Sequence, residues 1–214
     1  MEDVANTIRI RLEHARQAYG FRIVQKSKSP FMWALFYVGL MPLWQPGFMT
    51  TYTTTIGATM WTPLPPEQFG ENGVADLALL NHELKHIEDS RTILGPPWLS
   101  SIVYVVGYLF PQVLAPLSFL GLVWWPFWLF GLALLPWPAP FRVWVEVRGY
   151  EATLSTHLEE GEDEQSLRDR YRPFLLNQFT GWPYYRMALP WAWPNIWKKF
   201  ELIFWEKAAR RGRS

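Results

Sequence analysis

The sequence predicts an α+β protein that is mainly helical, with a small β-sheet before one central helix and a hydrophobic helical hairpin inserted between that helix and a later one. Three observations lead to this prediction. Apolar residues recur at helical spacing in several charged segments, residues 48–63 are rich in Thr, Tyr and Ile, and residues 92–141 contain no charged side chain. A chain of 214 residues can bury a substantial core, so we expect a single domain over 1–214.

The N-terminal part is expected to contain a helix followed by strands. Residues 3–18 carry an apolar stripe at helical spacing, and Gly20 after them is a suitable helix stop. Residues 21–26 alternate in part and predict a strand, whereas residues 31–44 are apolar, uncharged and short for a full membrane span. In the Thr-rich stretch, Gly57 marks either a break between two strands or a bulge.

Residues 74–90 are expected to form the helix that carries the most informative motif, His82-Glu83-Leu84-Lys85-His86. Positions i and i+4 stand one above the other on a helix, so the imidazoles of His82 and His86 can reach one metal ion. Glu83 lies on the same turn, where a carboxylate can take a proton from a metal-bound water. The alternative is a surface helix with two chance His, but the apolar run before the motif favours a buried helix.

The uncharged block is expected to contain a hydrophobic hairpin inserted at 97–137. Its length of about fifty residues allows two membrane crossings of about twenty residues each. Pro111 and Pro116 predict the turn of this hairpin, and several Trp side chains are suited to anchor it at a membrane interface. A hairpin packed inside a soluble protein is the alternative. We expect membrane association, because so small a domain cannot cover this much apolar surface, and flanking basic residues favour a cytoplasmic catalytic side.

Beyond the block, the pattern predicts helices again. Residues 142–158 and 162–176 are expected to form two amphipathic helices, and residues 195–210 a last helix before a basic tail. The aromatic and Pro-rich stretch 179–194 between them is expected to be irregular.

A third metal ligand is sought on the helix after the block, because two His side chains do not complete a catalytic zinc site. Glu146 is flanked by apolar residues, and a buried carboxylate needs a partner such as a metal. Glu151 is the alternative third ligand, although its position favours solvent. Tyr150 is placed to support a ligating His through a hydrogen bond.

These motifs resemble a known family. H-E-L-x-H on one helix, followed by E-x-x-x-Y-E-A on a later one, is similar to the gluzincin-type zinc metallopeptidases. The resemblance implies a zinc ion held by His82, His86 and Glu146, with Tyr150 as support for the first His. It also implies that the Thr-rich strand aligns an extended peptide substrate by strand addition.

The spacing of the motifs departs from that of compact members of the family. Glu146 follows His86 by 60 positions, and removal of residues 95–137 would restore a compact spacing. The hydrophobic hairpin is therefore interpreted as an insertion between the two metal-binding helices. Since both helices must meet at one metal, the chain has to return to the side it left, which requires an even number of membrane crossings.

The predicted function is that of a membrane-associated zinc metallopeptidase that acts on peptides or proteins. The oxyanion needs a donor besides the metal; the candidates are Tyr150, Tyr184, Tyr185 and Arg186. Two alternatives stay open: a membrane-anchored structural or interaction protein that keeps a metal site without turnover, and a metal-dependent hydrolase of a non-peptide bond. His14 and His157 are expected on helix surfaces. Glu88 and Asp89 are expected at a solvated helix end, with a role as hydrogen-bond partners of the metal ligands as the alternative.

Composition excludes other kinds of site. The chain has no Cys, which excludes disulfides, thiolate catalysis and cysteine zinc sites, so zinc must be held by His and carboxylate. The 20 Lys and Arg nearly balance the 19 Asp and Glu, and no general attraction to nucleic acid follows.

Overall fold

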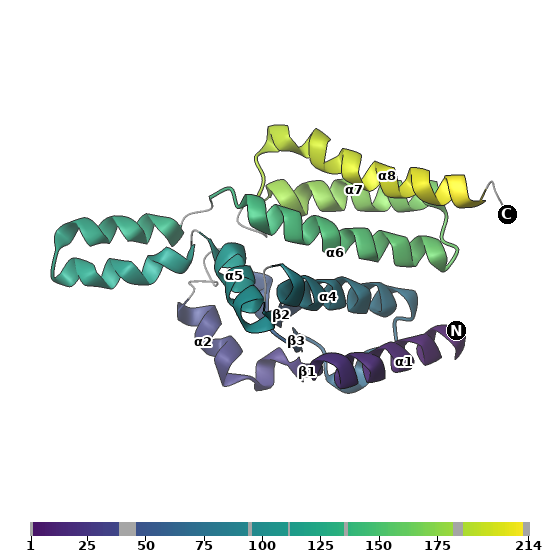
Figure 1. Ribbon diagram of the computed structural model, residues 1–214, viewed down its shortest axis with the longest axis horizontal. Helices are drawn as coiled ribbons and strands as arrows, with labels where there is room; N and C mark the ends of the chain where they lie inside the picture. Colours follow the sequence, from purple (N-terminus) through teal and green to yellow (C-terminus); the bar gives the residue numbers. More distant parts are fainter. Residues whose placement is uncertain are drawn as a thin grey trace.

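The computed structural model describes residues 2–38, 46–93, 96–110, 112–134, 137–181 and 186–211. As predicted, the fold is mainly helical with one small sheet near the N-terminus. Its centre is the packing of α4 (Val74–Thr92) along α6 (Pro140–Glu159), the two helices that carry the predicted metal ligands (Figure 1). One layer, with α1 and the sheet, lies on the α4 side, and a layer of α7 and α8 lies on the α6 side.

The N-terminal layer forms around α1 (Glu2–Tyr19), whose apolar stripe packs on α4. Ile8 and Ala15 from α1 are buried in one cluster with Leu77 and Leu80 from α4. This burial explains why the predicted amphipathic helix forms here: its apolar face has a partner, while its charged face stays in solvent.

The sheet has the strand order β1-β3-β2. β1 (Arg22–Gln25) pairs parallel with β3 (Thr59–Thr62), and β2 (Thr54–Ile56) pairs antiparallel with β3. Gly57 has φ of 61°, a left-handed conformation that glycine adopts without steric cost, and it lies in the turn between β2 and β3. Of the two predictions for Gly57, the break between strands is therefore confirmed. β2 is left at one edge of the sheet.

Between β1 and β2, the uncharged segment begins with α2 (Pro30–Val38), preceded by the 3₁₀ turn η1 (Lys26–Lys28). Residues 39–44 of the predicted apolar segment, together with residue 45, lie outside the described part. The chain continues with η2 (Pro46–Met49), which packs on α2 around the buried Met32 and Phe48. A further 3₁₀ turn, η3 (Pro66–Gln68), leads from the sheet to α4.

The C-terminal layer consists of α6, α7 (Glu164–Thr180) and α8 (Trp193–Arg211), with η7 (Pro190–Ala192) before α8. The Asp163 carboxylate accepts a hydrogen bond from the Ser166 N–H at 2.8 Å, which caps the start of α7. The three helices share an apolar core that includes Leu154, Phe179 and Phe200. The two predicted helices are thus confirmed: α7 begins and ends slightly later than the predicted 162–176, and α8 extends slightly beyond both ends of the predicted 195–210.

The uncharged block differs from the predicted two-helix hairpin. It forms three pieces: α5 (Pro97–Leu109), η4 (Gln112–Leu122) and η5 (Trp125–Leu134). The turn lies at 123–124, so the prediction of a turn at Pro111–Pro116 is wrong: Pro116 lies within η4, and Pro111 lies outside the described residues. Pro126 in the first turn of η5 accounts for this, because proline needs no N–H partner at a helix start.

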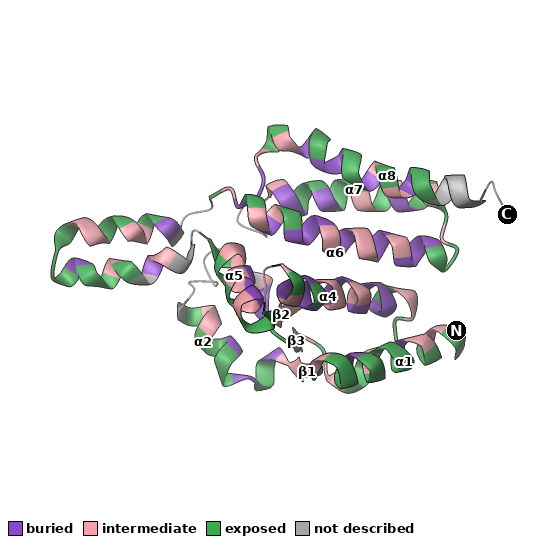
Figure 2. Cartoon of the chain, viewed as in Figure 1, coloured by how far each residue is buried: buried purple, intermediate pink, exposed green. Residues whose placement is uncertain are grey.

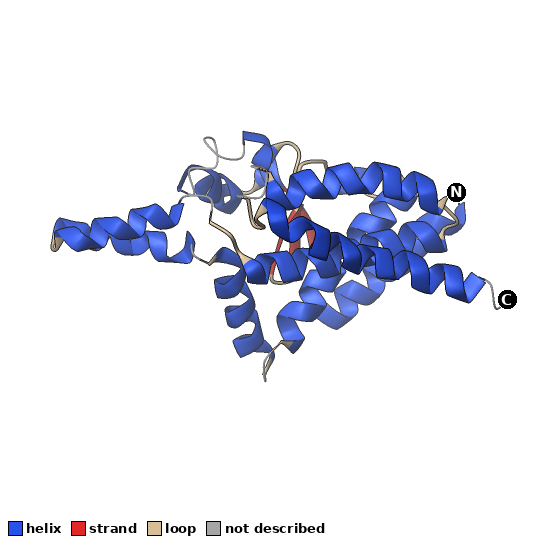
Figure 3. Cartoon of the chain, turned by 90° about the horizontal axis from the view of Figure 1, so that it is seen from above, coloured by secondary structure: helices blue, strands red, loops and turns tan. Residues whose placement is uncertain are grey.

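α5 packs back against the domain, while η4 and η5 pack on each other and project from it (Figures 1 and 3). Gly121 allows this pairing, since a Cβ at that position would lie 2.8 Å from the indole of Trp128. The projecting pair is largely exposed along its length (Figure 2).

Among the described residues, no helix alone is long and apolar enough to cross a membrane. One pair, α4 with α5, meets the criterion by length and composition when taken together, and it is bent by 117° at the break between them. The expectation of two separate crossings within 97–137 is therefore not fulfilled by any described helix.

Candidate metal centre

The structure brings His82, His86 and Glu146 together at the interface of α4 and α6. All three are buried, and they offer ligand atoms that lie within 4.8 Å of one another. His82 Nε2 lies 3.5 Å from Glu146 Oε2, and His86 Nε2 lies 4.0 Å from Glu146 Oε1. Ligands about 2.1 Å from a tetrahedral zinc stand about 3.4 Å apart. The three side chains are thus positioned to hold a metal ion.

The close approach of α6 to His82 depends on Gly149. A Cβ at this position would lie 2.7 Å from His82 Cε1 and Nε2, closer than real Cβ contacts. Gly149 falls one turn after Glu146 on the same face of α6. Its lack of a side chain therefore lets α4 and α6 pack tightly enough for Glu146 to reach both His rings.

The orientation of His82 is fixed from its far side. His82 Nδ1 lies 3.2 Å from the hydroxyl of Thr153, and that hydroxyl donates to the Gly149 carbonyl at 3.3 Å. Since the Thr153 proton points to Gly149, the hydroxyl oxygen accepts from His82 Nδ1–H. This arrangement directs the Nε2 atom of His82 toward Glu146, as a hydrogen-bonded partner does for metal-ligating His in other proteins.

Glu146 is held in turn by Tyr108 of α5. The Tyr108 hydroxyl donates to Glu146 Oε1 at 2.7 Å. The buried Arg142 donates from Nε to the Tyr108 carbonyl at 2.9 Å, and its guanidinium lies over the Tyr108 ring at 5.0 Å. With Oε1 occupied in this way, Oε2 is the oxygen that faces His82.

The electrostatics of the centre favour positive charge. Burial opposes the charged form of His82, but the hydrogen bond to Glu146 and the charges of Glu83 and Glu146 outweigh it and raise the pKa of His82. Burial likewise opposes the Glu146 carboxylate, yet the hydrogen bond from His82 and the charge of His86 lower the pKa of Glu146 to about 2. Burial, assisted by the charge on His82, lowers the pKa of His86. These directions favour a proton on His82 beside an ionised Glu146, in the place that a cation would take.

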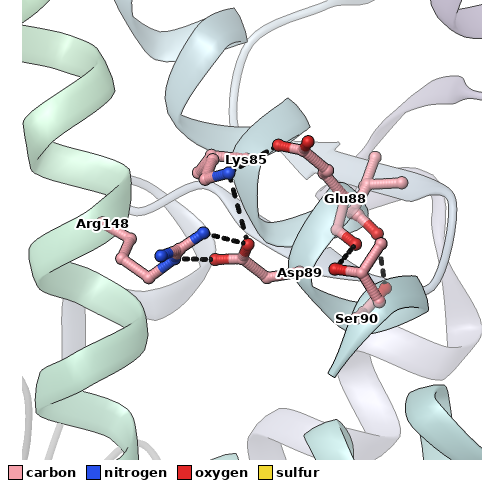
Figure 4. A network of polar contacts seen from close by, with 7 residues as sticks. Lys85, Glu88, Asp89, Ser90 and Arg148 are labelled. Atoms are coloured by element: carbon pink, nitrogen blue, oxygen red, sulfur yellow. Dashed lines mark hydrogen bonds and ion pairs between the residues drawn. The ribbon is translucent and has the colours of Figure 1, made fainter. Parts of the chain in front are cut away.

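A second polar network joins the same two helices one turn further along (Figure 4). Arg148 on α6 donates from Nε and Nη2 to the Asp89 carboxylate of α4 at 2.6 Å and 2.8 Å. Lys85 contacts Asp89 at 3.4 Å and Glu88 at 2.6 Å. Asp89 is buried, so the expectation that it lies in a solvated helix end is wrong; Glu88 is exposed as expected. This bidentate pair fixes the register of α4 on α6 beside the metal ligands.

A cavity of about 210 Å³ opens next to the candidate ligands. Glu83, which is buried, lines it together with His82, His86 and Glu146. Residues 53–57, which include β2, also line this cavity. Tyr104 and Tyr108 of α5 and Leu35 of α2 are further parts of its wall. The predicted base and the predicted edge strand therefore face one space with the ligands.

The remaining predicted residues are distributed differently. Glu151 lies outside the ligand cluster, with Arg148 and Lys199 as charged neighbours. Tyr150 packs its ring against that of His82 at 4.7 Å, and its role as a hydrogen-bond partner stays a prediction. Tyr184 and Tyr185 lie outside the described residues. Arg186 is exposed and is not part of the cavity wall.

His157 corrects another expectation, because it is buried and not on a solvated surface. Its Nδ1 pairs with Glu162 at 2.5 Å, and its Nε2 lies 2.8 Å from the Tyr171 hydroxyl. The three side chains join α6 to α7 at the end away from the ligand cluster. His14 is exposed as expected.

Sequence reasoning missed Tyr108, Thr153 and Gly149, which shape the centre, and Lys26, which lies buried nearby. Lys26 donates from Nζ to the Phe48 carbonyl at 2.7 Å and lies over its ring at 3.9 Å. Burial lowers the pKa of Lys26 to about 7, against the opposing charge of Glu83. Only Tyr108 had a signal, as a hydroxyl within an apolar block; the other roles depend on contacts between distant segments.

Comparison with known proteins adds no family to this picture. No protein-family model matches the chain, and neither the curated proteins nor the solved structures contain a match.

Proposed function

We propose that this protein is a zinc-dependent peptidase. The observation that supports the proposal is the convergence of His82, His86 and Glu146, all buried, with Glu83 beside them on the wall of a cavity. Two imidazoles and one carboxylate form a donor set typical of catalytic zinc, which keeps a fourth position for water. A bound zinc ion supplies Lewis acidity and lowers the pKa of that water to about 7.

The residues of the chain would transfer the proton, support the ligands and align the substrate. Glu83 accepts the proton of the attacking water and passes it to the leaving amine, which is the task of a general acid–base. Thr153 and Tyr108 hold the ligands in place through their hydrogen bonds to His82 and Glu146. The edge strand β2 lines the same cavity, where it can align an extended peptide by strand addition.

Membrane association belongs to the same proposal. Its support is the apolar, exposed pair η4–η5 and the absence of charge over 92–141. The side of the membrane on which the cavity lies stays a prediction from the flanking basic residues.

The test compares two Glu→Gln variants on one helix. Glu83→Gln should retain zinc and fold while hydrolysis of a peptide library, followed by mass spectrometry, falls by roughly 10²- to 10⁴-fold. Glu88→Gln is the matched control, since Glu88 is exposed and its carboxylate pairs with Lys85; it should cleave at the wild-type rate.

Three results would count against the proposal. Wild-type protein purified without zinc would contradict it, as would unchanged cleavage by Glu83→Gln. A zinc-loaded protein that cleaves no peptide would favour one of two alternatives, a structural protein that retains the site or a hydrolase of another bond. Turnover of ester or amide substrates by wild type, lost in Glu83→Gln, separates these two.

A further inference from the structure

The helix α5 has its polar and apolar faces reversed relative to a helix at an aqueous surface. Its hydroxyl-bearing residues point into the protein: Ser100 and Tyr104 are buried, and Tyr108 reaches Glu146. Its exposed large side chains are apolar, namely Trp98, Ile102, Val106 and Leu109, and the exposed Phe110 follows directly after the helix. The outer face of α5 therefore matches an apolar environment, and its inner face serves the metal centre.

The pair η4–η5 extends this apolar surface. Its exposed side chains include Leu117, Phe119, Leu120, Leu122, Val123, Trp124, Trp125, Trp128, Leu129 and Leu132. The four aromatic side chains among them, each more than half exposed, present on the order of 500 Å² of surface. That alone is comparable to the largest apolar patch of a typical soluble monomer, about 300–600 Å².

The distribution of these side chains favours a lipid environment over a protein partner. They occur on both members of a projecting pair and around its tip, so that one partner surface could cover only one side (Figures 1 and 2). A bilayer surrounds an inserted element on all sides. No charged residue lies between Arg91 and Arg142, so this surface also has no charge with which to select a protein partner.

The cavity beside the metal centre reaches this surface. Leu109 lines the cavity and is also part of the exposed apolar face of α5. Leu35 of α2 also lines it, and α2 exposes Phe31 and Tyr37. The cavity therefore opens between two helices whose outer faces are apolar.

We propose that α2, α5 and the η4–η5 pair seat the protein on one leaflet of a lipid bilayer, and that the substrate is a polypeptide segment lying in that bilayer or emerging from it. The second part rests on the proposed peptidase function. An 11-residue 3₁₀ helix such as η4 is about 22 Å long, less than the hydrocarbon thickness of about 30 Å. The pair enters the bilayer and does not cross it.

The docking part is tested by flotation with vesicles of phosphatidylcholine alone, whose zero net charge removes any attraction to basic segments. Wild type should float, and Leu122→Glu/Trp125→Glu should lower its partition at least tenfold. Leu202→Glu/Trp205→Glu on α8 is the matched control: these residues are 61% and 69% exposed, against 79% and 71% at the hairpin. The control should float like wild type.

Insertion depth can be measured directly with a spin label, because the chain has no Cys and a single introduced Cys is then labelled specifically. A nitroxide attached to Val123→Cys at the tip should lose access to a water-soluble relaxation agent when vesicles are added, whereas one at Leu202→Cys should not. Failure of wild type to float, or equal flotation of Leu122→Glu/Trp125→Glu, overturns the docking proposal. So does a wild-type dimer that the hairpin variant dissociates without any vesicle binding, since the face then binds a second copy.

The substrate part uses one cleavable peptide sequence in two forms, free in solution and tethered to a transmembrane helix in the same vesicles. Wild type should cleave the tethered form at least tenfold faster, and Leu122→Glu/Trp125→Glu should lose this preference while it cleaves the free peptide. Equal rates for wild type overturn the substrate assignment. Cleavage of neither form by zinc-loaded, vesicle-bound protein refutes the peptidase function itself, with the docking result standing on the flotation data.

Discussion

Replacing Gly149 by Ala should weaken metal binding by roughly 10- to 100-fold, a loss typical of changes next to a metal ligand. The new Cβ would lie 2.7 Å from His82 Cε1 and Nε2, whereas ordinary contacts begin at 3.4 Å. The His82 ring must therefore retreat by about 0.7 Å, more than the roughly 0.2 Å that a metal–ligand distance tolerates. The ring has little room, because it is bonded to Thr153 and packed against His86 at 4.6 Å.

The assay is a zinc titration against a competing chelator, combined with urea unfolding of the metal-free protein. Overpacking costs about 1–3 kcal/mol and Ala gains about 1 kcal/mol over Gly within a helix, so the free energy of unfolding should fall by up to about 2 kcal/mol. Gly131→Ala is the control, since a Cβ there meets nothing within 4 Å. Wild-type zinc affinity in Gly149→Ala would refute the argument that this glycine sets the helix spacing.

Three further predictions concern the surroundings of the ligands. Tyr108→Phe removes the hydroxyl that donates to Glu146, so zinc affinity should fall about tenfold with the fold intact, as measured by the same titration; an unchanged affinity would contradict it. In metal-free protein, the difference in unfolding free energy between wild type and Glu146→Gln should be largest between pH 4.5 and 6.5. The lowered pKa of Glu146 stabilises the fold above pH 4.5, and this stabilisation is lost as the pH falls toward about 2. The raised pKa of His82 stabilises the fold below pH 6.5, and this stabilisation is lost at higher pH. A difference in unfolding free energy that does not vary with pH would exclude the ion pair. Folding lowers the pKa of Lys26 from 10.5 to about 7, so between these pH values Lys26 is neutral in the folded chain and charged in the unfolded chain. The free energy of unfolding should therefore rise with pH over this range in wild type and stay level in Lys26→Met. Equal pH profiles of the two proteins in urea unfolding would argue against a buried neutral lysine.

The features that sequence predicted are those with a local cause. The i, i+4 spacing of His82 and His86 is a property of any helix, and Glu146 stood out because a single acid among apolar residues needs a partner. Both predictions required only that two helices meet. The helix and strand order followed in the same way from apolar periodicity and from Thr-rich segments.

What sequence could not predict depends on contacts between distant segments. Asp89 looked like a solvated acid because its partner Arg148 is 59 residues away. His157 was expected at the surface because nothing local indicates that α7 covers it through Tyr171. The turn of the apolar block was predicted in the wrong place because Pro111 and Pro126 are equivalent local signals for a turn. Only the packing of α5 on the domain decides which part of the block forms the projecting pair.

The packing of α5 also changes the meaning of the insertion. Judged by spacing alone, residues 95–137 are a removable segment, because their removal would restore a compact distance between the two motifs. In the structure, however, α5 lies within that segment and supplies Tyr108, which bonds Glu146, and part of the cavity wall. Gly107 brings α5 close to α6, because a Cβ there would lie 2.8 Å from the Phe141 ring. The helix that carries the exposed apolar face thus also positions the candidate third ligand, so this apolar surface and the candidate metal centre are parts of one packed unit.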